Sequence, residues 1–207
     1  MRVNFMQKID PAIIEGLAKA MMISVENHKN AMGTDEENLC LLKMHFIKDF
    51  SDDVIFLNNL CERVDLYYRY GYLLIRNMLE QLIEFLYVLK NTHLVDEYLG
   101  LKIDLDSLKE KHTPVGGERK FGKLRYLNKR PSIYDMTEDI GERVAQDGAF
   151  SLYDAYCVLS EKCHNSYFDS LLAEFNKAGA NTPTTGLIDE QMLLLNAIIA
   201  CVLIEYK

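Results

Sequence analysis

Apolar residues recur every three or four positions along most of the chain, which is the spacing that places side chains on one face of an α-helix. The pattern is clear after Asp10-Pro11 and continues to about Asn30. Asp10 can cap a helix, and Pro11 suits a first turn, because its missing N–H would have no partner there. These positions predict a first helix from Pro11 to about Asn30.

Further capping signals divide the next part of the chain. Thr34 and Glu37 have the spacing of a capping box, in which each side chain accepts a hydrogen bond from the backbone of the other residue. Ser51-Asp52-Asp53 follows as another cap. It predicts that a new helix begins there and continues, with a bend near Gly71, to about Asn91.

The second half of the chain carries similar signals. One or two shorter helices are expected over 93–111. Ser132 predicts a helix to about position 146, Ser151 with Asp154 predicts one to about 165, and a last helix is expected over about 187–206. No segment alternates between apolar and polar residues as a half-buried strand does. We therefore expect an all-α fold, an antiparallel bundle of about six to seven helices.

The length and the cysteines bear on organisation and compartment. At 207 residues the chain can bury a core without disulfides or metals, so we expect one domain, with a helical pair over 1–50, a core over 51–170 and a buried last helix over 187–206. The start of the chain lacks the features of a secretory signal. The five cysteines are scattered without a C-x-x-C pair. We expect reduced thiols in the cytoplasm, and no metal or other cofactor.

The charge pattern limits the expected partners. A formal net charge of −8 opposes non-specific binding to nucleic acid or to an anionic membrane. The longest apolar run, Met192 to Ile204, has 13 residues, whereas a membrane span needs about 20, so no membrane contact is expected. A basic stretch is the exception, and it is either a solvated linker or a weak phosphate contact. It consists of Arg119, Lys120, Lys123, Arg125, Lys129 and Arg130.

Two pairs of polar residues interrupt otherwise apolar helical segments. Arg76 and Glu80 form the first pair, and Ser160 and His164 form the second. Each pair is spaced i, i+4, so each projects from one face of its helix, and the two faces could meet in one pocket. Such a cluster suits a structural network, a ligand site or acid–base chemistry. Arg76 and Glu80 could equally form an exposed ion pair, and His164 could serve only the end of its helix.

Three strings occur in a fixed order: Arg76-Asn77-Met78-Leu79-Glu80, Ser132-Ile133-Tyr134-Asp135-Met136, and Tyr156-Cys157-Val158-Leu159-Ser160 continuing to His164-Asn165-Ser166. In order and separation they resemble a family of bacterial helical proteins known as domain of unknown function number 5677. The resemblance covers roughly residues 63–170. It implies a single α-helical domain in which Arg76, Glu80, Ser160 and His164 are family features, and it implies no activity.

A more distant resemblance is to the HEPN helical proteins, some of which are metal-independent ribonucleases of toxin and phage-defence systems. Their Arg and His stand on one helix, whereas no arginine occupies positions 157–159 ahead of His164. Two functions are therefore expected as alternatives. The first is a module that binds a small ligand or a protein through Arg76, Glu80, Ser160 and His164. The second is a ribonuclease in which His164 is the general acid or base, Glu80 orients it and Arg76 stabilises a phosphate.

The last helix adds one further expectation. Residues between Met192 and Ile204 are apolar on nearly all sides of the helix. A helix of this kind must be covered on most of its circumference. Either it lies at the centre of the bundle, or it packs against a second copy of the chain in a homodimer.

Overall fold

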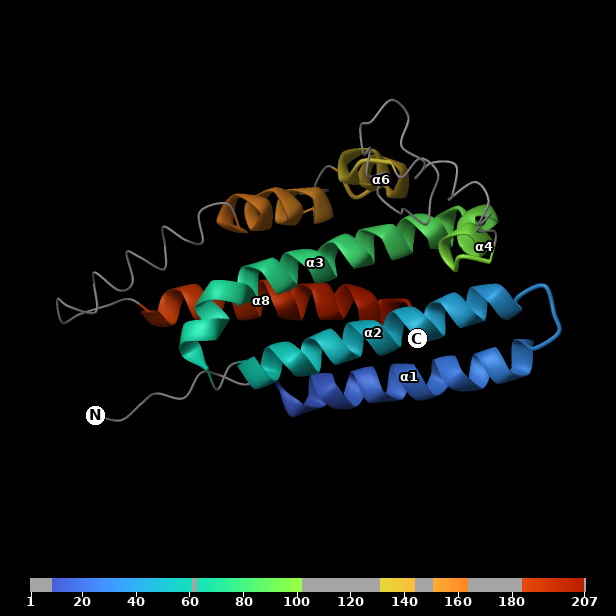
Figure 1. Cartoon of the computed structure of the whole chain (residues 1–207), viewed down its shortest axis with the longest axis horizontal. Coiled ribbons are helices and arrows are strands. Elements are labelled where there is room, and N and C mark those ends of the chain that lie inside the picture. Colours follow the sequence, from blue (N-terminus) through green and yellow to red (C-terminus); the bar gives the residue numbers. More distant parts are fainter. Residues whose placement is uncertain (1–8, 61–62, 102–130, 144–150, 164–183, 207) are drawn as a thin grey trace, which may run out of the picture.

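The computed structural model describes residues 9–60, 63–101, 131–143, 151–163 and 184–206 (Figure 1). Every regular element in these ranges is a helix, which confirms the predicted all-α helical bundle. The helices are α1 (Pro11–Ala31), α2 (Glu37–Leu60), α3 (Val64–Lys90), the 3₁₀-helix η1 (Thr92–Leu94), α4 (Val95–Tyr98), α6 (Ile133–Ile140) and α8 (Thr184–Ile204), together with a helical segment at residues 152–163.

The long helices lie side by side around α3. α1 and α2 form an antiparallel hairpin, and α3 returns along α2 in the opposite direction (Figure 1). α8 packs against α3 and also contacts α1. α6 and the 152–163 helix lie along the outer side of α3 (Figure 1). α3 therefore has neighbours on several sides, and eight of its described side chains are fully buried: Tyr67, Ile75, Met78, Leu79, Leu82, Ile83, Phe85 and Val88.

Aromatic rings and one glycine bring the helices of the core together. Phe46 of α2 stacks on Phe85 of α3 with ring centroids 3.9 Å apart, and Tyr206 stacks near Phe85 at 6.3 Å. Gly71 faces α8, because a Cβ added there would lie only 2.6 Å from Oε1 of Gln191. The absence of a side chain at Gly71 thus permits close approach of α3 and α8.

The start of α1 follows the prediction. The carboxylate of Asp10 accepts a hydrogen bond from the backbone N–H of Ala12 at 2.9 Å, and Pro11 is the first helical residue. The next predicted cap forms differently, because the Glu37 carboxylate accepts from the N–H of Gly33, at 2.7 Å, instead of the N–H of Thr34. Gly33 has a φ of 78°, a left-handed conformation that favours glycine, and α2 begins at Glu37.

The helix start predicted at Ser51-Asp52-Asp53 is wrong, because α2 continues through these residues to Leu60. Ser51 donates its hydroxyl to the carbonyl oxygen of Ile47 at 2.6 Å, a bond that serine makes inside helices. Val54 is fully buried, so the apolar face of α2 continues past the polar residues. The helix boundary comes later, between the end of α2 at Leu60 and the start of α3 at Val64. α3 continues through Gly71 without interruption.

The cap predicted for α6 is confirmed, but the helix is shorter than expected. Ser132 Oγ accepts from the N–H of Asp135 at 3.1 Å, and the Asp135 carboxylate accepts from the N–H of Ser132 at 3.2 Å. α6 ends at Ile140 instead of near position 146. Gly141, with a φ of 85°, adopts the left-handed conformation that commonly terminates helices.

Two further predictions concern the remaining chain. The basic residues at positions 119–130 lie outside the described residues, as does most of the expected helical region at 93–111. Across the ranges that the structure describes, no helix has the length and apolar character that crossing a membrane requires.

Candidate functional site

A polar contact joins α3 to the 152–163 helix. Nη2 of Arg76 donates a hydrogen bond to the hydroxyl of Tyr156 at 3.2 Å, and the guanidinium carbon lies 5.3 Å from the centre of the Tyr156 ring. A second contact lies one turn earlier in α3, where Nζ of Lys162 is 5.9 Å from the centre of the Tyr72 ring. Tyr72 precedes Arg76 in α3, whereas its partner Lys162 follows Tyr156, the partner of Arg76. The two helices therefore run antiparallel.

The 152–163 helix is fixed at its start and along its inner side. Ser151 Oγ accepts from the N–H of Asp154 at 3.0 Å, and the Asp154 carboxylate accepts from the N–H of Ser151 at 3.2 Å, which confirms the predicted cap. Leu159 is fully buried and Ala155 is nearly so. These contacts hold Tyr156 beside Arg76.

Arg76 also binds Glu80, one turn later in α3. Nη2 of Arg76 lies 2.7 Å from Oε1 of Glu80. The Arg76 side chain is 27% exposed and the Glu80 side chain is 23% exposed. The pair was expected either as an exposed ion pair or as part of a cluster between helices. The structure shows that it is largely covered. Burial opposes the charge on Arg76, but the hydroxyl of Tyr156 and the carboxylate of Glu80 outweigh it and raise the pKa of Arg76.

Two hydrogen-bond donors of this region lack a partner among the described residues. One is the Nε–H of Arg76, and the other is the hydroxyl of Ser160, which lies one helical turn after Tyr156. Both atoms are buried. A buried donor that remains unsatisfied costs about 1–3 kcal/mol, so each is a place where an acceptor from elsewhere would stabilise the protein.

Cys163 completes the described part of this cluster. Burial raises the pKa of its thiol, and the Arg76 guanidinium beside it partly opposes that effect. The thiol is therefore mainly protonated at neutral pH and is a poor nucleophile. Its position near Arg76 shows that the end of the helix, as well as its middle, faces α3.

The structure brings together part of the set predicted from the sequence. Arg76 and Glu80 are in direct contact, and Ser160 follows Tyr156, the partner of Arg76, on the same helix. His164 lies outside the described residues. The cluster predicted from the sequence did not include Tyr156, so its contact with Arg76 was missed. The i, i+4 spacing of Tyr156 and Ser160 was the signal that could have identified it.

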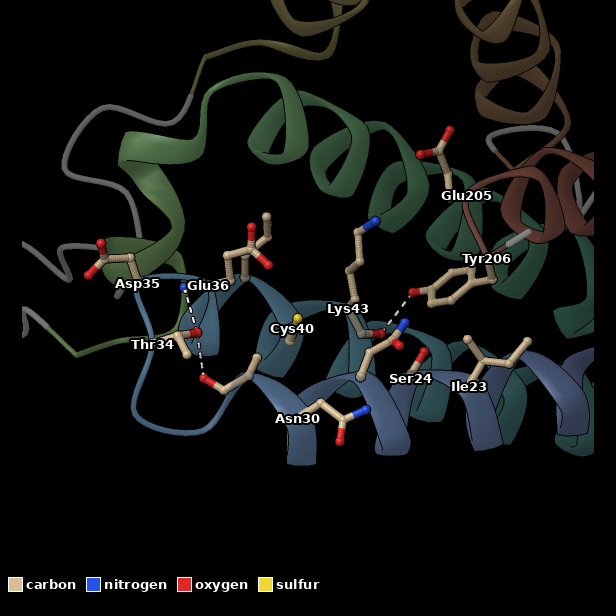
Figure 2. Close-up of a pocket in the computed structure, with 13 residues that line it drawn as sticks. Ile23, Ser24, Asn30, Thr34, Asp35, Glu36, Cys40, Lys43, Glu205 and Tyr206 are labelled. Atoms are coloured by element: carbon tan, nitrogen blue, oxygen red, sulfur yellow. Dashed lines mark hydrogen bonds between the residues drawn. The ribbon is translucent and has the colours of Figure 1, made fainter.

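A cavity of about 770 Å³ lies elsewhere, between α1, α2 and the end of α8 (Figure 2). Tyr206 closes one side, since its hydroxyl donates to the backbone carbonyl of Lys43 at 2.7 Å. Burial raises the pKa of Tyr206, which keeps this donor protonated. The sequence did not predict this cavity, because its lining comes from distant segments: Ile23, Ser24, Asn27, Asn30, Ala31, Thr34, Asp35, Glu36, Leu39, Cys40, Lys43, Glu205 and Tyr206.

The cavity has the size of a ligand site but not its usual chemistry. Ligand cavities of about 300–1,000 Å³ are mostly apolar with a few converging polar groups. Here three carboxylates, from Asp35, Glu36 and Glu205, share the lining with one ammonium group, from Lys43. We therefore take the cluster at Arg76, which holds unsatisfied buried donors, as the candidate site.

The comparisons with known proteins give no further assignment. No family model, no curated protein and no solved structure matches the chain significantly. Within the described ranges, no three residues among His, Cys, Asp and Glu are grouped so that they could hold a metal ion.

Proposed function

We propose that the protein is a helical binding module, and that a ligand or a protein partner binds at the cluster of Arg76, Glu80, Tyr156 and Ser160. The bound group would present oxygen acceptors, such as a carboxylate or a phosphate, to the two helices. The resemblance of the sequence to domain of unknown function number 5677 implies that Arg76, Glu80 and Ser160 are family features, which supports a shared role for these three residues. The scattered cysteines support a location in the cytoplasm.

The proposal rests on one observation. The Nε–H of Arg76 and the hydroxyl of Ser160 are both buried, and neither has a partner among the described residues. In a purely structural polar network the buried donors are normally satisfied. The Nε–H of Arg76 can only donate, and the Ser160 hydroxyl can donate as well as accept, so a single acceptor group would satisfy both atoms. Glu80 already neutralises much of the charge on Arg76, which favours a singly charged or neutral acceptor over a highly charged one.

The experiment observes the Arg76 Nε–Hε signal directly. In ¹⁵N-labelled protein, this signal is assigned with the variant Arg76→Lys and followed while acetate, and separately inorganic phosphate, is added. We expect a saturable shift of the Arg76 signal with at least one of the two anions. The variant Ser160→Ala, which removes the second donor, should weaken the binding several-fold.

Arg143 provides a matched control within the same protein. Its Nη1 lies 2.7 Å from Oε1 of Glu138 and its guanidinium carbon lies 4.0 Å from the centre of the Tyr134 ring, but its side chain is 36% exposed. The same three residue types thus form a more open cluster. The proposal is overturned if neither anion shifts the Arg76 signal, or if Arg143 responds equally.

The ribonuclease alternative depends on His164 and on the basic stretch, and both lie outside the described residues. It therefore stays a prediction of the sequence. Its test is RNA cleavage by the wild type and by His164→Ala at low salt, where loss of activity in the variant would favour the enzyme. An inactive wild type would exclude it.

A further inference from the structure

One side of α8 carries apolar residues that stay exposed among the residues that the structure describes. The side that faces the bundle is closed, since Leu195, Ile199 and Val202 are at most 1% exposed. On the opposite side, Leu193 is 71% exposed and Ile204 is 58% exposed. A helix that is apolar on nearly all sides is normally buried on all sides, so the outer side of α8 is expected to be covered by something.

The exposed residues of α8 form a regular seam. Leu193, Ala197, Ala200 and Ile204 are all exposed, and they are separated by four, three and four positions. This alternation of three and four is the spacing by which one helix packs along another in a coiled coil. The two central alanines leave room for a second helix to approach closely, while the two large residues stand at the ends.

The seam has the same order of large and small side chains in both directions along the helix. Two copies packed antiparallel would place Leu193 opposite Ile204 of the partner subunit and Ala197 opposite Ala200 of the partner subunit. Large residues would then meet large residues at both ends, and small residues would meet small ones in the middle. A surface that is complementary to itself in this way is what a two-fold symmetric dimer requires.

The charge distribution favours a second copy over a charged partner. No charged residue occurs from Gln191 to Ile204, although the whole chain has a formal net charge of −8. A basic or acidic partner would find no counter-charge on this seam, whereas two copies of the chain can approach there without bringing like charges together. The exposed amide of Asn196, beside the seam, can both donate and accept a hydrogen bond.

We infer that the outer side of α8 is a homodimer interface in which two copies of the chain pack antiparallel about a two-fold axis between Ala197 and Ala200. From Leu193 to Ile204 the seam spans about 17 Å of helix, which is short for a protein interface. We therefore expect a reversible dimer that forms at micromolar concentrations.

Sedimentation velocity over a range of protein concentrations tests the interface. The wild type should change from monomer to dimer as concentration rises. Ala197→Glu and Ala200→Lys should each shift the midpoint at least ten-fold to higher concentration, because each places two like charges in the seam. Phe56→Glu, at an exposed apolar residue of α2, is the matched control and should dimerise like the wild type.

The double variant Ala197→Glu/Ala200→Lys tests the antiparallel arrangement. In that arrangement each new carboxylate faces a new ammonium group of the other copy, so dimerisation should return. Circular dichroism of every variant verifies that the helices remain folded. A wild type that is monomeric at several hundred micromolar, single variants that dimerise normally, or a double variant that stays monomeric would each overturn the inference.

Discussion

Arg76 binds Tyr156 across 80 positions of the sequence, and the same Nη2 atom contacts Glu80 within its own helix. One guanidinium therefore connects a local ion pair to a contact between two helices. Because the 152–163 helix covers the guanidinium, the local pair is shielded from water. This shielding distinguishes the pair of Arg76 and Glu80 from the exposed ion pairs of the same protein.

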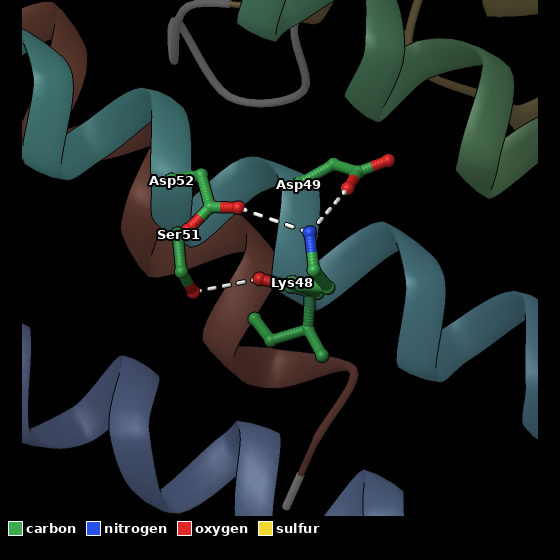
Figure 3. Close-up of polar contacts among 5 residues, drawn as sticks. Lys48, Asp49, Ser51 and Asp52 are labelled. Atoms are coloured by element: carbon green, nitrogen blue, oxygen red, sulfur yellow. Dashed lines mark hydrogen bonds and ion pairs between the residues drawn. The ribbon is translucent and has the colours of Figure 1, made fainter.

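Glu80→Gln should destabilise the protein more than Asp52→Asn. Lys48 and Asp52 of α2 form an ion pair with the same i, i+4 spacing and the same order of charges, at 3.1 Å, but their side chains are 54% and 66% exposed (Figure 3). Such an exposed pair contributes no more than about 0.5 kcal/mol. Loss of Glu80 leaves a largely covered guanidinium without its counter-charge, and we expect a cost of about 1–2 kcal/mol.

Urea denaturation of the two variants and the wild type measures this difference. Both substitutions remove one negative charge and keep the size of the side chain, so the change in net charge cancels in the comparison. Equal losses of stability in Glu80→Gln and Asp52→Asn would contradict the covered character of the Arg76 pair.

Asp53 should make the stability depend on pH. Burial raises the pKa of this carboxyl above its usual 3.8; the Gln81 side chain partly opposes this effect, and Asp49 and Asp52 add to the rise. A carboxyl with a raised pKa binds a proton more readily in the folded than in the unfolded chain. The free energy of unfolding therefore falls as pH rises through the pKa of the folded state.

The variant Asp53→Asn removes this effect. Relative to the wild type, it should be more stable at pH 7, and the advantage should shrink as the pH falls through the raised pKa of Asp53 and should be gone below about 4, where the carboxyl is protonated in the folded and the unfolded chain alike. Thermal unfolding of both proteins between pH 3 and pH 7 gives the difference. An advantage that is the same at every pH, or that grows toward low pH, would show that burial does not raise the pKa of Asp53.

Gly71 and Gln191 should be energetically coupled. Replacing glycine by alanine inside a helix normally stabilises it by about 1 kcal/mol. At Gly71 the new methyl group would meet the amide of Gln191, which is fully buried and has no hydrogen-bond partner among the described residues. We expect Gly71→Ala to yield less than that gain in the wild type, and the full gain in the Gln191→Ala background. Additive effects in chemical denaturation would contradict the close approach of α3 and α8.

The helical class and several helix ends could be predicted from the sequence, because they depend on local chemistry. Asp10-Pro11 and the Ser132–Asp135 pair act within a few residues, and the structure has both caps. The error at Ser51 shows the limit of that reasoning. Its hydroxyl could cap a new helix or bond to the preceding turn, and the buried contacts of α2 on both sides decided between them.

The candidate site could be predicted only in part, because its contacts join distant segments. The i, i+4 spacing identified Arg76 with Glu80 from a single helix. Tyr156 was left out of the predicted cluster: its spacing to Ser160 shows that the two residues share a helix face, but local spacing cannot identify a partner 80 positions away. The cavity at Lys43 and Tyr206 was missed for the same reason.

A double-mutant cycle with Arg76→Met and Tyr156→Phe tests most directly whether the two helices share one polar centre. Tyr156→Phe keeps the ring and removes the hydroxyl, so alone it should lower the free energy of unfolding by about 1 kcal/mol. In the Arg76→Met background the same change should cost almost nothing. We predict a coupling energy of about 0.5–1.5 kcal/mol between the two residues. A coupling of zero within error would contradict a shared centre.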